Sequence, residues 1–199
     1  MQDFTAARMA DTPDELWLLE HMPVYTQGQA GRAEHVLHAG DIPVIRTDRG
    51  GQITWHGPGQ MMFYTLLDTK RLQLGPRALV TLLEQVVIDV LGVLGIAARA
   101  RREAPGVYVR RSDGYDAKIA ALGLRFRQQG CYHGVSLNID NDLSPFAGIN
   151  PCGYAGMPVT RLADLMPALP AREELESLFV RGFAQTLHCA DIQRIPAHD

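Results

Sequence analysis

Lysine is scarce in this chain of 199 residues, because 17 of its 19 basic residues are arginines. The two lysines are Lys70, in a polar DTKR turn, and Lys118, in the apolar run 117–122. A guanidinium stays protonated, whereas a buried ammonium can lose its proton and then act as a base. We therefore expect Lys70 at the surface and treat Lys118 as a candidate for chemistry that arginine cannot perform.

The chain also lacks long apolar runs, a secretory signal and paired cysteines. No stretch approaches the roughly 18 apolar residues that a membrane-spanning helix needs, and residues 1–15 contain no apolar core of a signal peptide. The cysteines, Cys131, Cys152 and Cys189, form no CxxC motif, and no histidine stands at metal-ligand spacing from them. These absences predict free thiols in a reducing cytoplasm, with no metal and no membrane association.

Positive charge is concentrated in the middle of the chain. The net charge is −3, which argues against general nucleic-acid binding. Residues 71–130 nevertheless hold ten basic and five acidic side chains, whereas the segments on either side are acidic. Such a region fits an acidic partner, although a solvated arginine-rich loop explains the charge equally well. Seven of its arginines are Arg99, Arg101, Arg102, Arg110, Arg111, Arg125 and Arg127.

Residues 49–68, RGGQITWHGPGQMMFYTLLD, are the most informative stretch. Four glycines and Pro58 predict a tight loop, and the apolar run 61–67 predicts a buried strand after it. The stretch has neither the GxxxxGK[ST] nor the GxGxxG pattern of nucleotide-binding loops. Arginine, histidine, tryptophan and two glutamines beside the loop indicate a lined pocket. A hairpin whose glycines serve only its turns is the alternative.

Periodicity predicts two helices among several strands. Between Pro76 and Gly95 apolar residues recur at three- and four-residue steps, as on the buried face of a helix. The long loop at 141–158 has a length that is typical of functional loops. The order of elements predicts an α+β fold with a mixed, largely antiparallel sheet and flanking helices. Strands are expected at 14–20, 21–27, 42–47, 61–67, 106–110, 117–127 and 131–139, helices at 76–94 and 172–188, and helical turns at 32–37 and 161–166.

Cys152 differs from the other two cysteines in its surroundings. It lies between proline and glycine in the long loop, where rigid backbone can hold a side chain toward a pocket. A small residue in a crowded turn is the plainer interpretation. Cys131 opens a strand and is expected to have a structural role, and Cys189 at the end of an amphipathic helix is expected to be a buried, inert thiol.

A thiol becomes a nucleophile when a neighbouring base or positive charge favours the thiolate. By residue type, Lys118, His56 and His133 all suit that role. Lone histidines are more often structural and hydrogen-bonded to backbone. The sequence contains no distances, so spacing alone leaves the choice among the three open.

Five segments, in order, resemble the lipoyl/octanoyl transferase family: RGGQITWHGPGQ, APGVYV, ALGLR in the strand of Lys118, HGVSLN and DLSPFAGINPCGYAGM. The resemblance extends from Asp14 to Arg161. It implies the α+β fold of the biotin/lipoate protein ligase superfamily, whose ligases do not share the INPCG loop. It also implies one catalytic domain over residues 1–199, in which a first strand carried by other members is absent.

The resemblance also implies roles for individual residues. Cys152 would be the acyl-thioester nucleophile, Lys118 would activate it, and no cofactor would take part. Contacts with the acyl chain would come from three segments: Arg49, Gly50, Gly51, Gln52, Ile53, Thr54, Trp55 and His56; Ala121, Leu122 and Gly123; Gly134, Val135 and Ser136.

The reaction that the resemblance implies is the first step of endogenous protein lipoylation. Octanoyl-acyl carrier protein would be the donor, and lipoyl domains of 2-oxoacid dehydrogenase E2 subunits and the glycine cleavage H protein would be acceptors. A thioester donor already supplies the driving force, so no ATP is expected. The alternatives are an ATP-dependent lipoate or biotin ligase of the same fold, a cysteine-dependent thioester hydrolase, and a binding module without catalysis.

Overall fold

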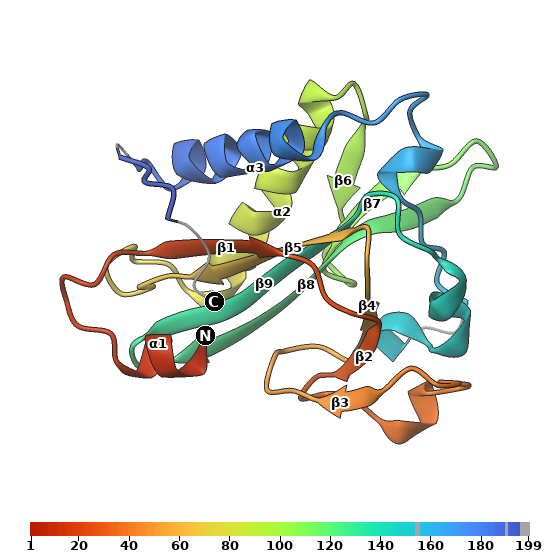
Figure 1. Cartoon of the computed structure of the whole chain (residues 1–199), viewed down its shortest axis with the longest axis horizontal. Helices are drawn as coiled ribbons and strands as arrows, with labels where there is room; N and C mark the ends of the chain where they lie inside the picture. The colour runs from red at the N-terminus through yellow and green to blue at the C-terminus, as the bar shows by residue number, and fades with distance from the viewer. Residues whose placement is uncertain (154–155, 190, 196–199) are drawn as a thin grey trace.

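A six-stranded antiparallel sheet forms the centre of the protein (Figure 1). The computed structural model describes residues 1–153, 156–189 and 191–195. The sheet contains five of the seven predicted strands and one short edge strand, β6, that was not predicted. In spatial order its strands are β1 (Glu15–Leu19), β5 (Gln60–Leu66), β9 (Gly130–Asn138), β8 (Asp116–Arg127), β7 (Val107–Arg110) and β6 (Ala98–Ala100).

Two helices, α2 (Pro76–Val93) and α3 (Arg172–Thr186), lie side by side on one face of this sheet (Figure 1). The apolar stripe of α2 is buried as its periodicity predicted, with proline in the first turn and Gly95 just after the end at φ +77°. From α3, Phe179 stacks on Phe63 of β5 with ring centroids 4.4 Å apart. The predicted α+β fold is confirmed, and its main core lies between the helices and the sheet.

A second, three-stranded sheet contains β3 (Val44–Arg46), β2 (Val24–Gln27) and β4 (Ile53–His56) in that order. β2 pairs with β3 in parallel and with β4 antiparallel, which makes the fold mixed. The expectation of a loop over residues 49–59 was wrong at β4. Ile53 and Trp55 are buried in a small core with Phe146, so this part of the glycine-rich stretch extends along β2.

The remaining helical elements are short: α1 (Gln2–Ala6), η1 (Ala33–His35), η2 (Ser144–Gly148), η3 (Pro151–Gly153) and η4 (Leu162–Asp164). η1 matches the helical turn expected at 32–37. The turn expected at 161–166 is a single 3-10 turn, because Ala163 donates its backbone N–H to Ile139 O, 2.9 Å away at the end of β9. The loop at 141–158 is thereby tied to the sheet at its far end.

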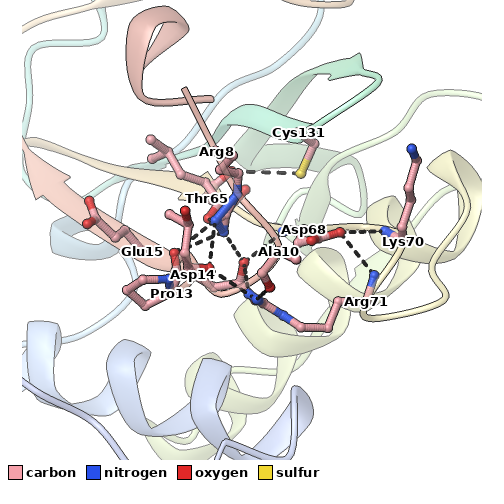
Figure 2. Close-up of polar contacts among 12 residues, drawn as sticks. Arg8, Ala10, Pro13, Asp14, Glu15, Thr65, Asp68, Lys70, Arg71 and Cys131 are labelled. Carbon is pink, nitrogen blue, oxygen red and sulfur yellow. Dashed lines mark hydrogen bonds and ion pairs between the residues drawn. The ribbon is translucent and has the colours of Figure 1, made fainter. Parts of the chain in front are cut away.

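A buried guanidinium ties the N-terminal segment to the end of β5 (Figure 2). Arg8 donates to Pro13 O at 2.8 Å and forms an ion pair with Asp14. Asp14 Oδ1 also accepts hydrogen bonds from Arg71 Nη2 at 2.8 Å and from the backbone N–H of Asp68 at 2.7 Å. Because one carboxylate joins three segments, residues 8–14 are fixed against the turn that follows β5.

Candidate active site

Lys118 is a buried lysine near the start of β8. Its side chain is only 4% exposed, its Nζ donates to Pro105 O at 3.0 Å, and Nζ lies 5.1 Å from the centroid of the Tyr108 ring. Burial disfavours the charged form of an amine. The prediction that Lys118 is buried is confirmed, and a side chain that reaches bulk water is excluded. Lys70 is exposed, as expected.

Gly106 allows the turn before β7 to close around the Lys118 amine. Its φ is +141°, a conformation that only glycine adopts readily. A Cβ at this position would lie 2.9 Å from Lys118 Cε, 3.1 Å from Nζ and 2.8 Å from Ala120 O. The APG motif therefore has a physical reason: it places the Pro105 carbonyl and a side-chain-free residue against the amine.

The long loop that carries Cys152 contacts β4 through η3 and β8 through Pro158. Cys152 belongs to η3, but its side chain is outside the part of the chain that the structure describes. On one side, a Cβ on Gly153 would lie 3.0 Å from Gln52 Nε2. On the other side, Lys118 N donates to Pro158 O at 2.8 Å. The long loop is thus joined to β8 at Lys118 by Pro158, and Gly153 of the same loop lies beside Gln52.

A cavity opens where both sheets meet. Residues from β2, β4, β5, β8 and β9 line it, and they include most of those predicted to contact substrate. The predicted residues in the lining are Arg49, Gly51, Gln52, Ile53, Thr54, His56, Ala121, Leu122, Gly123, Gly134 and Ser136. The lining residues that the prediction of substrate contacts omitted are Thr26, Thr47, Met62, Tyr64 and His133.

Three predicted contact residues lie outside this lining. Trp55 is 3% exposed and packs in the small core, and Val135 is fully buried in the main core. Gly50 is held through its backbone, since its N–H donates to Leu124 O at 2.8 Å. On β9 alternation explains the difference, because Gly134 and Ser136 point to the opposite face of the strand from Val135. The same alternation, applied to β5, would have found Met62 and Tyr64.

His56 is completely occupied by neutral partners. Its Nδ1 lies 2.7 Å from Gln60 Oε1 and its Nε2 lies 3.2 Å from Thr26 Oγ1. Gln60 Nε2 donates to Asn138 Oδ1 at 2.8 Å, so the Gln60 oxygen is left to accept from Nδ1. Burial lowers the pKa of His56 to about 3. The ring is neutral at neutral pH and is poorly suited to take a proton from a thiol.

Arg49 fixes the same wall of the cavity. Its Nε donates to Thr26 Oγ1 at 3.0 Å, its Nη1 donates to Gly50 O at 2.9 Å, and Nη2 donates to Thr26 O. The guanidinium is buried, and its charge adds to burial in lowering the pKa of His56. Arg49 therefore stabilises the glycine-rich stretch and presents a positive charge at the cavity.

His133 is in the lining of the cavity, whereas Lys118 is not. Its Nε2 is 2.9 Å from Asp48 Oδ1, and its φ of +64° is a strained conformation inside β9. Burial lowers the pKa of His133 against the effect of Asp48. His133 pairs with Leu124, and roughly 20 Å of β8 separates Leu124 from Lys118 at about 3.3 Å per residue. This separation is too long for a direct proton transfer between His133 and Lys118.

The other two cysteines have different environments from each other. Cys131 is buried, its Sγ lies 3.8 Å from Thr65 O, and burial raises the pKa of its thiol to about 11, which agrees with the structural role expected for it. The expectation of a buried thiol at Cys189 was wrong. α3 ends at Thr186, so Cys189 lies beyond the helix and is exposed.

The basic middle of the chain separates into two groups. Arg125 and Arg127 lie at the far end of β8, where Arg127 is 3.7 Å from Asp48. The other five lie around β6, β7 and the turn before β8, and several pair with acids, as Arg99 does with Asp116. This arginine cluster consists of Arg99, Arg101, Arg102, Arg110 and Arg111.

Residues 1–153, 156–189 and 191–195 contain neither a membrane-spanning helix nor a cluster of metal-binding side chains. No helix in these ranges is long and apolar enough to cross a membrane. Within the same ranges, no group of three or more histidine, cysteine, aspartate or glutamate side chains could hold a metal ion.

Residues 1–184 match the family described as the lipoyl protein ligase A/B catalytic domain. A protein of Chromohalobacter salexigens named octanoyltransferase is 58% identical over 87% of this chain and 76% of its own length. The octanoyltransferase of Dechloromonas aromatica is also 58% identical, over 89% of this chain and 84% of its own length.

Solved structures agree on the fold. A lipoate-protein ligase A bound with ATP superposes with a TM-score of 0.73 at 17% identity, over 94% of this chain and 78% of that one. A bipartite lipoate protein ligase from Thermoplasma acidophilum gives a TM-score of 0.72 at 16% identity, over 94% and 76%. The resemblance to the lipoyl/octanoyl transferases is confirmed, and the chain is an acyltransferase that belongs to the family of lipoyl protein ligase A/B catalytic domains.

Proposed function

We propose that this acyltransferase moves an octanoyl group from octanoyl-acyl carrier protein to a lysine of lipoyl domains, through a thioester on Cys152. The observation that carries the proposal is the buried amine of Lys118, whose backbone is hydrogen-bonded to the loop that bears Cys152. The names of the relatives at 58% identity support octanoyl as the acyl group.

In the first half-reaction, the Cys152 sulfur attacks the thioester carbonyl carbon of the donor. Lys118 accepts the thiol proton, the carbon–sulfur bond to the carrier breaks, and the carrier thiolate leaves with the proton that Lys118 returns. One thioester is exchanged for another, so neither ATP nor a metal ion is needed to balance the step.

In the second half-reaction, the ε-amino group of the acceptor lysine attacks the acyl-enzyme. Lys118 takes a proton from that amine and returns it to the Cys152 sulfur as the carbon–sulfur bond breaks and the amide forms. An amide is more stable than a thioester, which makes this half downhill. Lys118 thus acts as the base in both half-reactions.

The cavity fits the acyl chain in chemistry and position. Met62 and Leu122 are in its lining, and Ala121 lies three residues from Lys118 on β8. The substrate contacts implied by the resemblance, at Arg49–His56, Ala121–Gly123 and Gly134–Ser136, belong to this proposal as a set. The lipoyl domains of 2-oxoacid dehydrogenase E2 subunits and the glycine cleavage H protein are the proposed acceptors, the cytoplasm is the proposed location, and residues 1–199 are the proposed catalytic domain.

The test is transfer from octanoyl-carrier protein to an isolated lipoyl domain, without nucleotide, followed by the mass of the lipoyl domain. The proposal expects acceptor-dependent octanoylation of one lysine. Transfer that requires ATP and Mg²⁺ would identify a ligase instead. Release of free octanoate at the same rate with and without acceptor would identify a thioester hydrolase.

A further inference from the structure

Glu84 is a carboxyl group on the buried face of α2. It is 7% exposed and lies among the apolar side chains that pack α2 on the sheet. Burying a carboxyl group costs free energy unless it is hydrogen-bonded. The Glu84 carboxylate has such a bond, since its Oε1 accepts the backbone N–H of Gly106 at 2.7 Å.

The same peptide unit contacts Lys118 at its other end. Gly106 N and Pro105 O belong to one planar peptide. This peptide donates its N–H to Glu84 Oε1, and its oxygen accepts a hydrogen bond from Lys118 Nζ, 3.0 Å away. Hydrogen bonds that share a peptide polarise one another. A carboxylate on the N–H makes the carbonyl a stronger acceptor for the lysine.

We propose that Glu84 is a positioning residue for Lys118 and acts through the Pro105–Gly106 peptide. The inference rests on the proposed function only in taking Lys118 to be the base. A glycine can adopt φ +141° and many other conformations at little cost, so an acceptor for the Gly106 N–H is what keeps the peptide in this orientation. Without it, the Pro105 carbonyl turns away and the amine loses its fixed place beside the Cys152 loop.

The electrostatics are consistent with a coupled pair. Burial raises the pKa of Glu84, and the Gly106 hydrogen bond and the charge of Lys118 oppose that rise. A hydrogen-bonded carboxylate near the lysine also favours a proton on the amine. Both ends of the peptide therefore act on the proton that Lys118 accepts and returns.

The first experiment compares steady-state octanoyl transfer by Glu84→Leu, Glu84→Gln and Asp89→Asn. Leucine favours a helix and suits the apolar surroundings but removes the acceptor, and kcat is expected to fall roughly 10–100-fold with KM nearly unchanged. Glutamine keeps an oxygen for the Gly106 N–H and is expected to recover most of the loss. Asp89 is an exposed carboxylate on the same helix, and its variant should match the wild type. A wild-type kcat for Glu84→Leu, or equal losses with leucine and glutamine, would overturn the proposal.

The second experiment asks whether Glu84 acts through Lys118. The rate of Cys152 alkylation by iodoacetamide is measured by peptide mass in a Cys189→Ala background, with and without Lys118→Ala. Glu84→Leu is expected to slow alkylation when Lys118 is present and to change nothing when it is absent. Equal slowing in both backgrounds would mean a general structural effect and contradict the inference. Since this readout needs no octanoyl donor, it separates failure of the positioning role from failure of the proposed function.

Discussion

Lys118 and His56 are both buried basic groups, but their hydrogen-bond partners differ. The ring nitrogens of His56 meet a glutamine oxygen and a threonine hydroxyl, which fix the neutral tautomer. The amine of Lys118 meets a backbone carbonyl, and a carboxylate holds the other end of that peptide. Burial alone therefore does not identify a base. The partners decide whether a buried group can change its protonation state.

The largest effect is expected from substitutions of Lys118. Lys118→Arg keeps a positive charge that cannot be given up, so it is expected to lose nearly as much transfer activity as Lys118→Ala, roughly 10²–10⁴-fold in kcat. Lys70→Arg, at the exposed lysine, is the matched control and should be neutral. Near wild-type transfer by Lys118→Arg would move the role of base away from this end of the site.

The next largest effect is expected at Gly106, in the turn that contacts Lys118. Gly106→Ala places a Cβ against Lys118 and Ala120 O, and the displaced amine is expected to lower kcat roughly 10–100-fold. Gly114 also has a positive φ, +86°, but a Cβ added there would meet open space, so Gly114→Ala is the control. Its backbone strain should lower the melting temperature without lowering kcat. Equal kcat losses in the two variants would show that backbone strain, not contact with Lys118, is responsible.

Replacing His56 should change the pH dependence of folding stability rather than the proton transfer of the reaction. His56 has a pKa of about 3 when folded against 6.5 as the reference value. Between these values the unfolded state binds the extra proton, so stability falls as the pH falls. His56→Gln is expected to remove about 2–3 kcal/mol of the loss in unfolding free energy between pH 7 and pH 4.5. Urea titrations at both pH values measure this difference in unfolding free energy, and His38→Gln, at an exposed histidine, is the control. An unchanged pH dependence would contradict a neutral, buried His56.

The smallest expected effect concerns the arginine cluster. Replacing Arg110 and Arg111 by alanine should raise the apparent KM for carrier-bound octanoyl roughly 2–5-fold, because exposed ion pairs each contribute little. Salt should act in the same direction, since it screens charges over about 8–10 Å. Arg127→Ala, at the far end of β8, and a short synthetic octanoyl thioester are the controls. Equal sensitivity of both donors would exclude docking of an acidic carrier at this cluster.

Local patterns predicted most of the fold. Alternation and the steps of α2 located the long strands and both main helices, because burial on one face imposes those periods. β4 was missed since its pairing with β2 is a tertiary contact that glycine-rich composition conceals. The exposure of Cys189 depended on where α3 ends, and helix ends are poorly fixed by composition.

The site was predictable as a set of segments but not as a geometry. The motifs contained most of the residues that line the cavity. Lys118 could be singled out because it is the one lysine in an apolar strand. The Glu84–Gly106–Lys118 arrangement could not be found this way. In the sequence Glu84 is a single acidic residue on an apolar helix, and nothing marks it as functional. Its partner is the backbone of a turn 22 residues away.

The most direct measurement is the intact mass of the protein after incubation with octanoyl-carrier protein, followed by peptide mapping. The account predicts one octanoyl increment that hydroxylamine removes, located on Cys152 and retained in Cys131→Ala and Cys189→Ala. Cys152→Ala should carry no increment and transfer no octanoyl group to a lipoyl domain. Wild-type transfer by Cys152→Ala, or an increment on any other residue, would contradict the account.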